Sequence, residues 1–147
     1  MIDAPIPKLL MRAWAAPYSA LGLLLGLAML LAGGRMQVRQ GALEFDGGRL
    51  GRLAARLPPP LCFSAITLGH VILGTDQAAL AAARSHEQVH VRQYERWGIL
   101  FVPAYLFSSL VQLALGRRPY QDNRFEREAC AQSCAPTRHD SPDRTNA

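Results

Sequence analysis

Apolar residues gather in two long uncharged runs along this chain of 147 residues. The first run extends from Ala13 to Gly34 and is rich in Leu and Ala, and the second extends from Gly98 to Gly116. Roughly 20 consecutive apolar residues are enough for an α-helix to cross a bilayer. The pattern predicts an N-terminal transmembrane helix and a second apolar helix.

The first run is bracketed by Arg12 and Arg35. A secretory signal is the alternative interpretation, because Lys8 and Arg12 precede an apolar core that ends in the small residues Ala32-Gly33-Gly34. The apolar core is long for a signal peptide, which favours an anchor. We therefore assign residues 1–34 to an N-terminal membrane anchor.

Between the two runs, the spacing of polar and apolar residues is typical of small β structure. Met36 to Phe45 alternates apolar and polar residues, and Asp46-Gly47-Gly48 is a turn signal. Leu50 to Leu57 fits a helical turn or a strand, and Cys62 to Leu73 predicts one or two strands broken at Gly69. The expected fold class is α+β.

A long helix is predicted after these strands. Thr75-Asp76 is a plausible N-cap, and neither Gly nor Pro occurs again until Gly98, so the helix is expected from Asp76 to Trp97. Projection at 3.6 residues per turn places His86 and His90 on one uncharged arc. The two histidines are therefore expected to face the protein interior, where a ligand would justify their burial.

Within this helix, His86-Glu87-Gln88-Val89-His90 forms the pattern H-E-x-x-H. Side chains four residues apart lie on the same helix face, so both imidazoles can reach one Zn²⁺. The glutamate between them then lies beside the metal, where it can take a proton from a bound water. The alternative is a surface helix with two unrelated histidines.

A catalytic zinc site needs a third protein ligand and an open position for water. Asn123 is a possible cap of a further helix whose first residues include Glu126 and Glu128, and we prefer Glu126 as the ligand. His70, in the apolar segment upstream, is another candidate. The alternative for the acidic pair is a solvated first turn, where negative charge is favourable.

These motifs resemble those of the gluzincins, and the chain looks like a minimal member of the short membrane-bound zinc metallopeptidases of that type. The likeness covers roughly residues 65–131 and is carried by the H-E-x-x-H pattern and by Glu126-x-x-Ala129, which is similar to the family motif E-x-x-A-D. The resemblance implies that His86, His90 and Glu126 bind Zn²⁺ and that Glu87 activates water.

One position departs from the family pattern. Cys130 stands where the family has an Asp that orients a ligand histidine. A thiol does not replace a carboxylate in that role, so either Glu128 or a backbone carbonyl orients the imidazole, or the site is weaker.

The resemblance also implies a domain organisation. A small zincin-like core, with a short sheet, the H-E-x-x-H helix and a second Glu-bearing helix, is expected in residues 35–134 and includes the apolar helix 98–116. Residues 135–147 are polar and contain proline, and are expected to form a disordered tail.

The apolar segment 98–116 constrains this organisation, because one complete crossing of a membrane would place His86 and Glu126 on opposite sides. Pro103 and Ser108-Ser109 suggest an interrupted helix that returns the chain to its starting side. The alternative is an ordinary second span, which would leave the first motif short of a ligand.

The function expected from these features is membrane-associated, zinc-dependent hydrolysis of a peptide or protein substrate, with Glu87 as the general base. Tyr120 and His70 are candidate donors to the oxyanion of the reaction. The segment Gly69–Leu73 is a candidate substrate-binding edge, with a plain core strand as the alternative. The competing function is a non-catalytic, membrane-anchored module that binds zinc or a partner, which a fourth ligand such as His70 or Cys130 would support.

Charge adds an expected location. The formal net charge is +5, but the arginines are dispersed, so no nucleic-acid partner is expected. Arg35, Arg39, Arg49 and Arg52 follow the first run, and the positive-inside rule then places the metal-bearing region in the cytoplasm, against a bacterial-type inner membrane. If residues 1–34 are instead a signal peptide, that region is periplasmic. The 3 cysteines do not resemble a disulfide framework.

Overall fold

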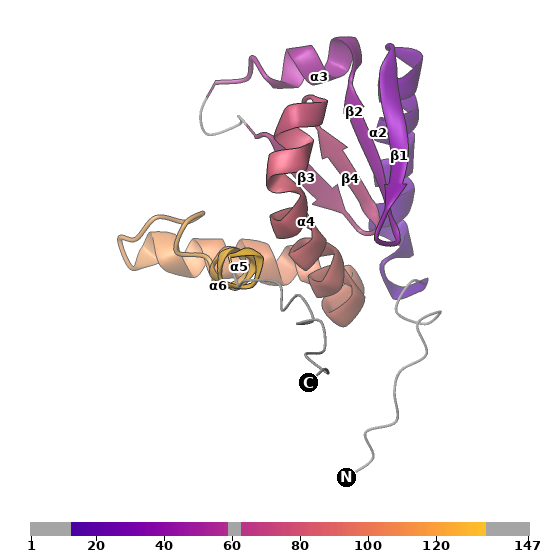
Figure 1. The fold of residues 1–147 in the computed structure, drawn as a ribbon. Helices are drawn as coiled ribbons and strands as arrows, with labels where there is room; N and C mark the ends of the chain where they lie inside the picture. Colours follow the sequence, from indigo (N-terminus) through magenta and orange to yellow (C-terminus); the bar gives the residue numbers. More distant parts are fainter. Residues whose placement is uncertain (1–12, 59–62, 135–147) are drawn as a thin grey trace, which may run out of the picture.

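The computed structural model describes residues 13–58 and 63–134. The predicted tail 135–147, the start of the predicted anchor and residues 59–62 lie outside the described residues. The chain has an α+β fold (Figure 1). Its elements are α2 (Ala16–Leu31), β1 (Gly34–Arg39), β2 (Ala42–Gly47), α3 (Gly48–Ala54), β3 (Ala65–Leu68), β4 (Val71–Gly74), α4 (Gln77–Trp97), the 3-10 turn η1 (Gly98–Leu100), α5 (Phe101–Ala114) and α6 (Arg124–Ser133).

Within the described residues the strands form one 4-stranded sheet in the order β1-β2-β4-β3. The central pair, β2 and β4, is parallel, and both outer pairs are antiparallel. The β1–β2 hairpin turns at Gln40 (φ 50°) and Gly41 (φ 82°), which is the left-handed geometry of a two-residue hairpin turn. The β structure predicted in 36–45 and 62–73 is confirmed over the described residues: the first range is divided between β1 and β2, and the second between β3 and β4.

The strand proposed as a substrate-binding edge is an interior strand. β4, which contains most of Gly69–Leu73, lies between β2 and β3 and is buried along its whole length. Its run of Val, Ile and Leu suits a strand that is covered on both faces. The prediction was therefore wrong, and β3 occupies the edge of the sheet.

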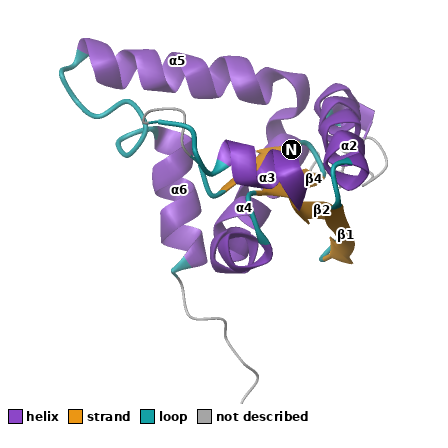
Figure 2. Cartoon of the chain, turned by 90° about the horizontal axis from the view of Figure 1, so that it is seen from above, coloured by secondary structure: helices purple, strands orange, loops and turns teal. Residues whose placement is uncertain are grey.

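Helices cover both faces of the sheet, with α2 on one side and α4 on the other (Figure 2). Two glycines one turn apart bring α2 very close to the strands. A Cβ atom at Gly26 would lie 2.5 Å from the ring of Phe45, and one at Gly22 would lie 2.7 Å from Cβ of Val71. The first apolar run thus packs one face on the sheet, and its anchoring role stays a prediction.

The α4 helix has the bounds that its end signals predict. Asp76 Oδ1 accepts a hydrogen bond from Ala79 N at 2.9 Å, and Gly98, with φ 54°, ends the helix. An ion pair with a buried carboxylate joins the helix to the sheet: Arg84 Nε donates to Glu44 Oε1 at 2.9 Å, and Glu44 is fully buried while Arg84 is 27% exposed. This pair helps to fix the position of α4, and with it the H-E-x-x-H turn, along the sheet.

The second apolar run forms η1 and α5, which leave the end of α4 in a new direction (Figure 1). By length and composition, the helical stretch Gln77–Ala114 is the one among the described residues that is long and apolar enough to cross a membrane. Its most apolar 18 consecutive residues are mostly exposed, since 11% of them are buried.

The break in this stretch is at Gly98, and α5 itself is continuous. The expected interruption at Pro103 and Ser108-Ser109 was therefore wrong. Pro103 lies in the first turn of α5, where a backbone N–H has no partner inside the helix, so proline is tolerated there. After α5 the chain turns back, and α6 packs on α4. This packing brings Glu126 to the histidines, and the expected return of the chain to its starting side of a membrane stays a prediction.

Candidate metal centre

Three side chains from two helices converge at one point. His86 and His90 of α4 and Glu126 of α6 are the group of potential metal ligands within residues 13–58 and 63–134. The two Nε2 atoms are 3.1 Å apart. Glu126 Oε2 lies 3.1 Å from His86 Nε2, and Glu126 Oε1 lies 3.3 Å from His90 Nε2. Each pair of side chains therefore approaches to 3.1–3.3 Å, through both carboxylate oxygens of Glu126, and one ligand atom from each residue lies within 4.8 Å of the others; this group is called the donor triangle below.

The shortest separations within this group, 3.1–3.3 Å, are close to those between neighbouring ligands of a metal ion. Zn–N and Zn–O bonds of about 2.0–2.2 Å in a tetrahedral site separate neighbouring ligand atoms by about 3.3–3.5 Å. Two imidazoles and one carboxylate are also a ligand set of catalytic zinc sites, which leave the fourth position free. The residues present could therefore hold a metal ion, and their chemistry suits Zn²⁺.

A buried amide orients His90. Its Nδ1 lies 2.8 Å from Oε1 of Gln93, one turn further along α4. Because that oxygen can only accept, Nδ1 carries a proton, and Nε2 is the ring nitrogen that would bind a metal. Gln93 Nε2 in turn donates to the carbonyl of Phe125 and to Glu128 Oε2, each at 3.1 Å. Glu128 therefore reaches a ligand through Gln93 and not directly.

The second histidine has a weaker partner. Nδ1 of His86 lies 3.9 Å from Sγ of Cys130, an exposed residue of α6. A thiol is a poor hydrogen-bond acceptor, and the imidazole is correspondingly less constrained than His90. Cys130 thus lies beside the ligand, on the side of the ring that faces away from the donor triangle.

Contacts between α5 and α6 position Glu126. Asn123 Oδ1 accepts from Phe125 N at 2.9 Å and caps α6. The amide nitrogen of Asn123 donates to the carbonyl of Tyr105 at 3.0 Å and to Ser109 Oγ at 2.7 Å. The start of α6, which carries Glu126 in its first turn, is thereby fastened to the apolar helix.

The carboxylate of Glu126 is buried and ionised. Burial alone would raise its pKa, but hydrogen bonds from His86 and His90, the charge of His90 and a hydrogen bond from Tyr105 lower the pKa well below its usual range. Tyr105 Oη donates to Oε1 at 2.7 Å. The pKa of His90 is raised: burial lowers it, but the hydrogen bond and the charge of Glu126 outweigh that effect.

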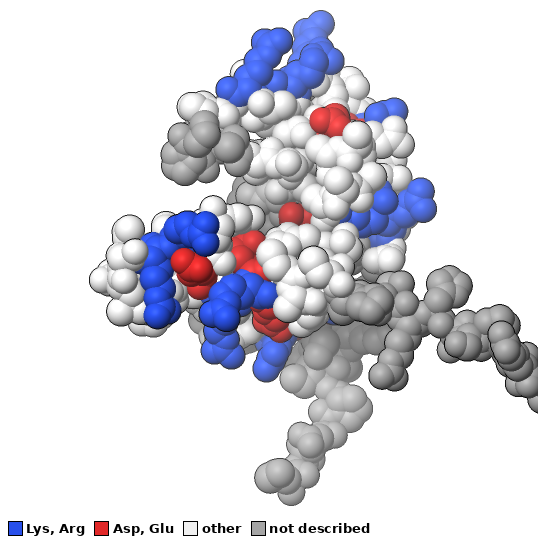
Figure 3. Space-filling view, turned by 60° about the vertical axis from the view of Figure 1, so that its left-hand side comes forward, with Lys and Arg blue, Asp and Glu red and all other residues white. Residues whose placement is uncertain are grey.

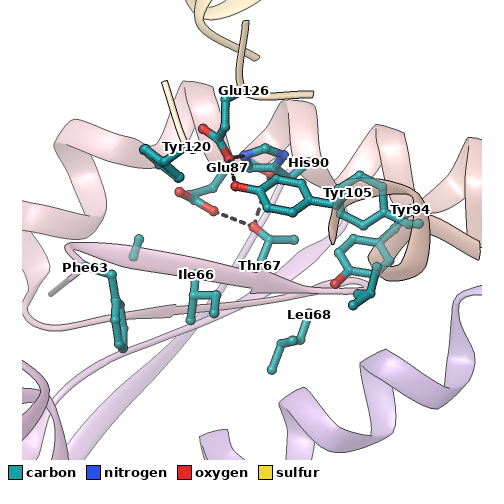
Figure 4. Close-up of a pocket in the computed structure, with 13 residues that line it drawn as sticks. Phe63, Ile66, Thr67, Leu68, Glu87, His90, Tyr94, Tyr105, Tyr120 and Glu126 are labelled. Carbon is teal, nitrogen blue, oxygen red and sulfur yellow. Dashed lines mark hydrogen bonds and ion pairs between the residues drawn. The ribbon is translucent and has the colours of Figure 1, made fainter. Parts of the chain in front are cut away.

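Glu87 lies beside the triangle in a cavity of about 340 Å³. Thr67 of the edge strand β3 donates its hydroxyl to Glu87 Oε2 at 2.7 Å, which fixes the carboxylate. In Figure 4 the carboxylates of Glu87 and Glu126 and the hydroxyl of Tyr105 point into the same space. A substrate in this cavity would meet the candidate base and the candidate metal position together.

The two proposed oxyanion donors have different surroundings. Tyr120 lines the cavity while remaining 57% exposed, and its partial burial and the charge of Glu126 raise its pKa. His70 is not among the residues that line this cavity. Its Nε2 lies 3.1 Å from Glu95 Oε1, and its backbone N–H donates to Ser19 Oγ at 3.0 Å. His70 thus connects α2 to α4, away from the donor triangle.

Three residues of the site escaped the sequence analysis: Thr67, Gln93 and Tyr105. Gln93 carried a usable signal, because it follows His90 by one turn on the uncharged arc. Thr67 was a lone hydroxyl within an apolar strand, and Tyr105 lay inside an apolar run. Nothing local distinguishes either of them from a packing residue.

No protein-family model matches the chain, and no curated protein and no solved structure is significantly similar to it. The class that the fold and site define is an α+β protein with a candidate metal centre of two histidines and one glutamate. Any activity therefore has to be argued from the site itself.

Proposed function

We propose that this protein is a zinc-dependent metallopeptidase. The observation that carries the proposal is the triangle of His86, His90 and Glu126, with Glu87 held beside it in a cavity. The same residues support gluzincin-like chemistry, because they stand at the positions of the metal ligands and the general base in the gluzincin motifs that the sequence resembles. The zincin-like fold remains part of the proposal.

When bound, zinc would lower the pKa of a coordinated water toward neutrality and polarise the substrate carbonyl. Glu87 would take the proton from the attacking water and pass it to the leaving amine. The hydrogen bond from Thr67 holds Glu87 toward the cavity before substrate arrives. Burial and the Gln93 amide keep the His90 ring in place throughout.

A developing oxyanion needs a hydrogen-bond donor besides the metal. Tyr105 and Tyr120 both line the cavity, and both are protonated at neutral pH because the ordinary tyrosine pKa of about 10 is raised further here. Tyr105 already donates its single hydroxyl proton to Glu126 at 2.7 Å, so it would have to give up that hydrogen bond to serve an oxyanion.

The competing proposal, a non-catalytic zinc module, needs a closed site with four protein ligands. Across the described part of the chain, the candidate group has His86, His90 and Glu126 as its members. Cys130 lies on the Nδ1 side of His86, opposite the atom that would bind the metal. Both facts favour an open fourth position and hence catalysis.

The test combines zinc content and hydrolysis in the full chain, purified in detergent. Zinc is measured by elemental analysis, and cleavage of casein and of a mixture of synthetic peptides is measured by mass spectrometry. Glu87→Gln should keep zinc and lose cleavage, whereas His90→Ala and Glu126→Ala should lose both. Glu95→Gln, the same change outside the cavity on the same helix, is the matched control. Full cleavage by Glu87→Gln would sink the mechanism.

A further inference from the structure

Two helices present large apolar side chains to the outside. On α2, Leu24 is 67% exposed and Leu31 is 83% exposed. On α5, Phe107 is 69% exposed and Leu110 is 62% exposed, and further leucines of both helices are more than half exposed. Extended apolar patches of this kind are rare on soluble monomers and mark sites of interaction.

The two exposed helices lie on the same side of the molecule. In Figure 1, α2 and α5 both belong to the more distant parts, behind the sheet and α4, and both run roughly in the plane of the picture. Figure 2, seen from above, places α5 and α2 toward one side, with β1, α4 and α6 toward the opposite side. One flat apolar environment can therefore cover both helices at once.

Basic side chains lie next to this apolar surface and are absent from it. No charged residue occurs from Ala13 to Gly34 or from Gly98 to Gly116. Arg117 and Arg118 follow α5 directly and are exposed, and α3, beside α2, carries the exposed Arg49 and Arg52. On the face drawn in Figure 3, basic groups gather in separate places, with uncharged surface and a few acidic groups between them. Apolar helices with flanking arginines fit a bilayer that has anionic headgroups.

We propose that the outer faces of α2 and α5 together form one surface that binds an anionic phospholipid bilayer, with both helices lying along the membrane. α5 has 14 residues and α2 has 16 residues. At about 1.5 Å per residue they are about 21 and 24 Å long, shorter than a hydrocarbon core of about 30 Å. Each helix also uses one side for contacts within the protein, so neither is free to be surrounded by lipid.

This surface is independent of the proposed catalysis, and vesicle binding tests it without any enzymatic readout. The full chain is mixed with vesicles of phosphatidylcholine alone or with phosphatidylglycerol added, and binding is measured by flotation. The wild type should float with the anionic vesicles. The double variant Phe107→Glu and Leu110→Glu should bind at least tenfold more weakly. Equal binding to neutral vesicles would overturn the assignment of anionic lipid.

The matched control is Gln77→Glu with Ala81→Glu, which adds the same charge at exposed positions of α4. It should float like the wild type, and circular dichroism checks that both double variants are folded. If the control loses binding equally, net charge and not the apolar surface determines binding, and the proposal fails. A different result would be a wild type that does not float and forms a dimer, which the α5 variant converts to a monomer. In that case a second copy of the chain covers the surface, and the proposal fails.

The depth of spin labels in the membrane distinguishes a helix that lies along the bilayer from a helix that crosses it. Leu106 and Leu113 are seven residues apart on one face of α5, or about 10 Å along its axis. Each is changed to Cys, in a chain whose native cysteines are Ser, and carries a spin label. Equal depth of the two labels in anionic vesicles supports the proposed arrangement. A difference of about 10 Å would show a crossing helix and overturn it.

Discussion

Gln93 is the residue whose replacement best tests how the metal centre is held. Its amide lies 2.8 Å from Nδ1 of His90 and 3.1 Å from both the Phe125 carbonyl and Glu128, and the side chain is buried. Gln93→Leu keeps most of the volume and removes every one of these hydrogen bonds. Loss of a group that orients a ligand histidine lowers metal affinity by roughly 10–100-fold, or about 1.4–2.7 kcal/mol.

The same change should also destabilise the metal-free protein. The N–H of His90 loses its acceptor in a buried place, and each buried polar group left without a partner costs about 1–3 kcal/mol. Urea unfolding of the metal-free chain should therefore show a lower free energy of unfolding. Added zinc should restore less stability than it does in the wild type, because the affinity is lower.

Zinc affinity is measured by competition with a fluorescent chelator, in detergent and at neutral pH. Gln77→Leu is the matched control, since Gln77 lies at the exposed start of the same helix. The control should bind zinc like the wild type. If Gln93→Leu also binds zinc within twofold of a zinc-binding wild type, the amide does not orient His90 and the reasoning is refuted.

Three further predictions concern other contacts. Cys130→Asp should raise zinc affinity several-fold in the same chelator assay, because a carboxylate is a stronger acceptor for the ligand histidine than a thiol 3.9 Å away; unchanged or weaker binding would contradict this. Arg84→Ala should lower the free energy of unfolding, measured by urea titration, by about 3–5 kcal/mol, because it leaves Glu44 buried without a counter-ion. Replacement of the exposed Arg92 by Ala is the control and should change this free energy by less than about 0.5 kcal/mol. Gly26→Leu should lower the free energy of unfolding by about 1–3 kcal/mol or prevent the packing of α2, because even a Cβ atom would lie 2.5 Å from the ring of Phe45. An unchanged melting temperature would show that α2 is not held this close to the sheet.

The long helix and the common face of its two histidines were predictable because their signals are local. Asp76 caps α4 and Gly98 ends it, so both bounds follow from single residues. The spacing of His86 and His90 fixes their common face once the segment is helical. The choice of Glu126 over Glu128 came from the resemblance, and the structure brings Glu126 to the histidines.

The order of the strands was not readable from the sequence. β3 and β4 are both short and mainly apolar, and only the pairing of β4 with β2, from a distant segment, decides which of them is the edge. The role of Gly22 and Gly26 was hidden for a similar reason. Two small residues four apart suit close packing, but the partner was β structure that follows later in the chain.

The helix α5 connects the two proposals physically. Its outer face carries Phe107 and Leu110, and its other side holds the start of α6 through the backbone of Tyr105 and through Ser109. Phe101, at its first turn, packs on Phe125 with ring centroids 5.3 Å apart. A bilayer that binds the outer face thus restrains the element that positions Glu126. If both proposals hold, zinc affinity should be higher in anionic vesicles than in detergent, and the variant Phe107→Glu with Leu110→Glu should abolish that difference while retaining zinc binding in detergent.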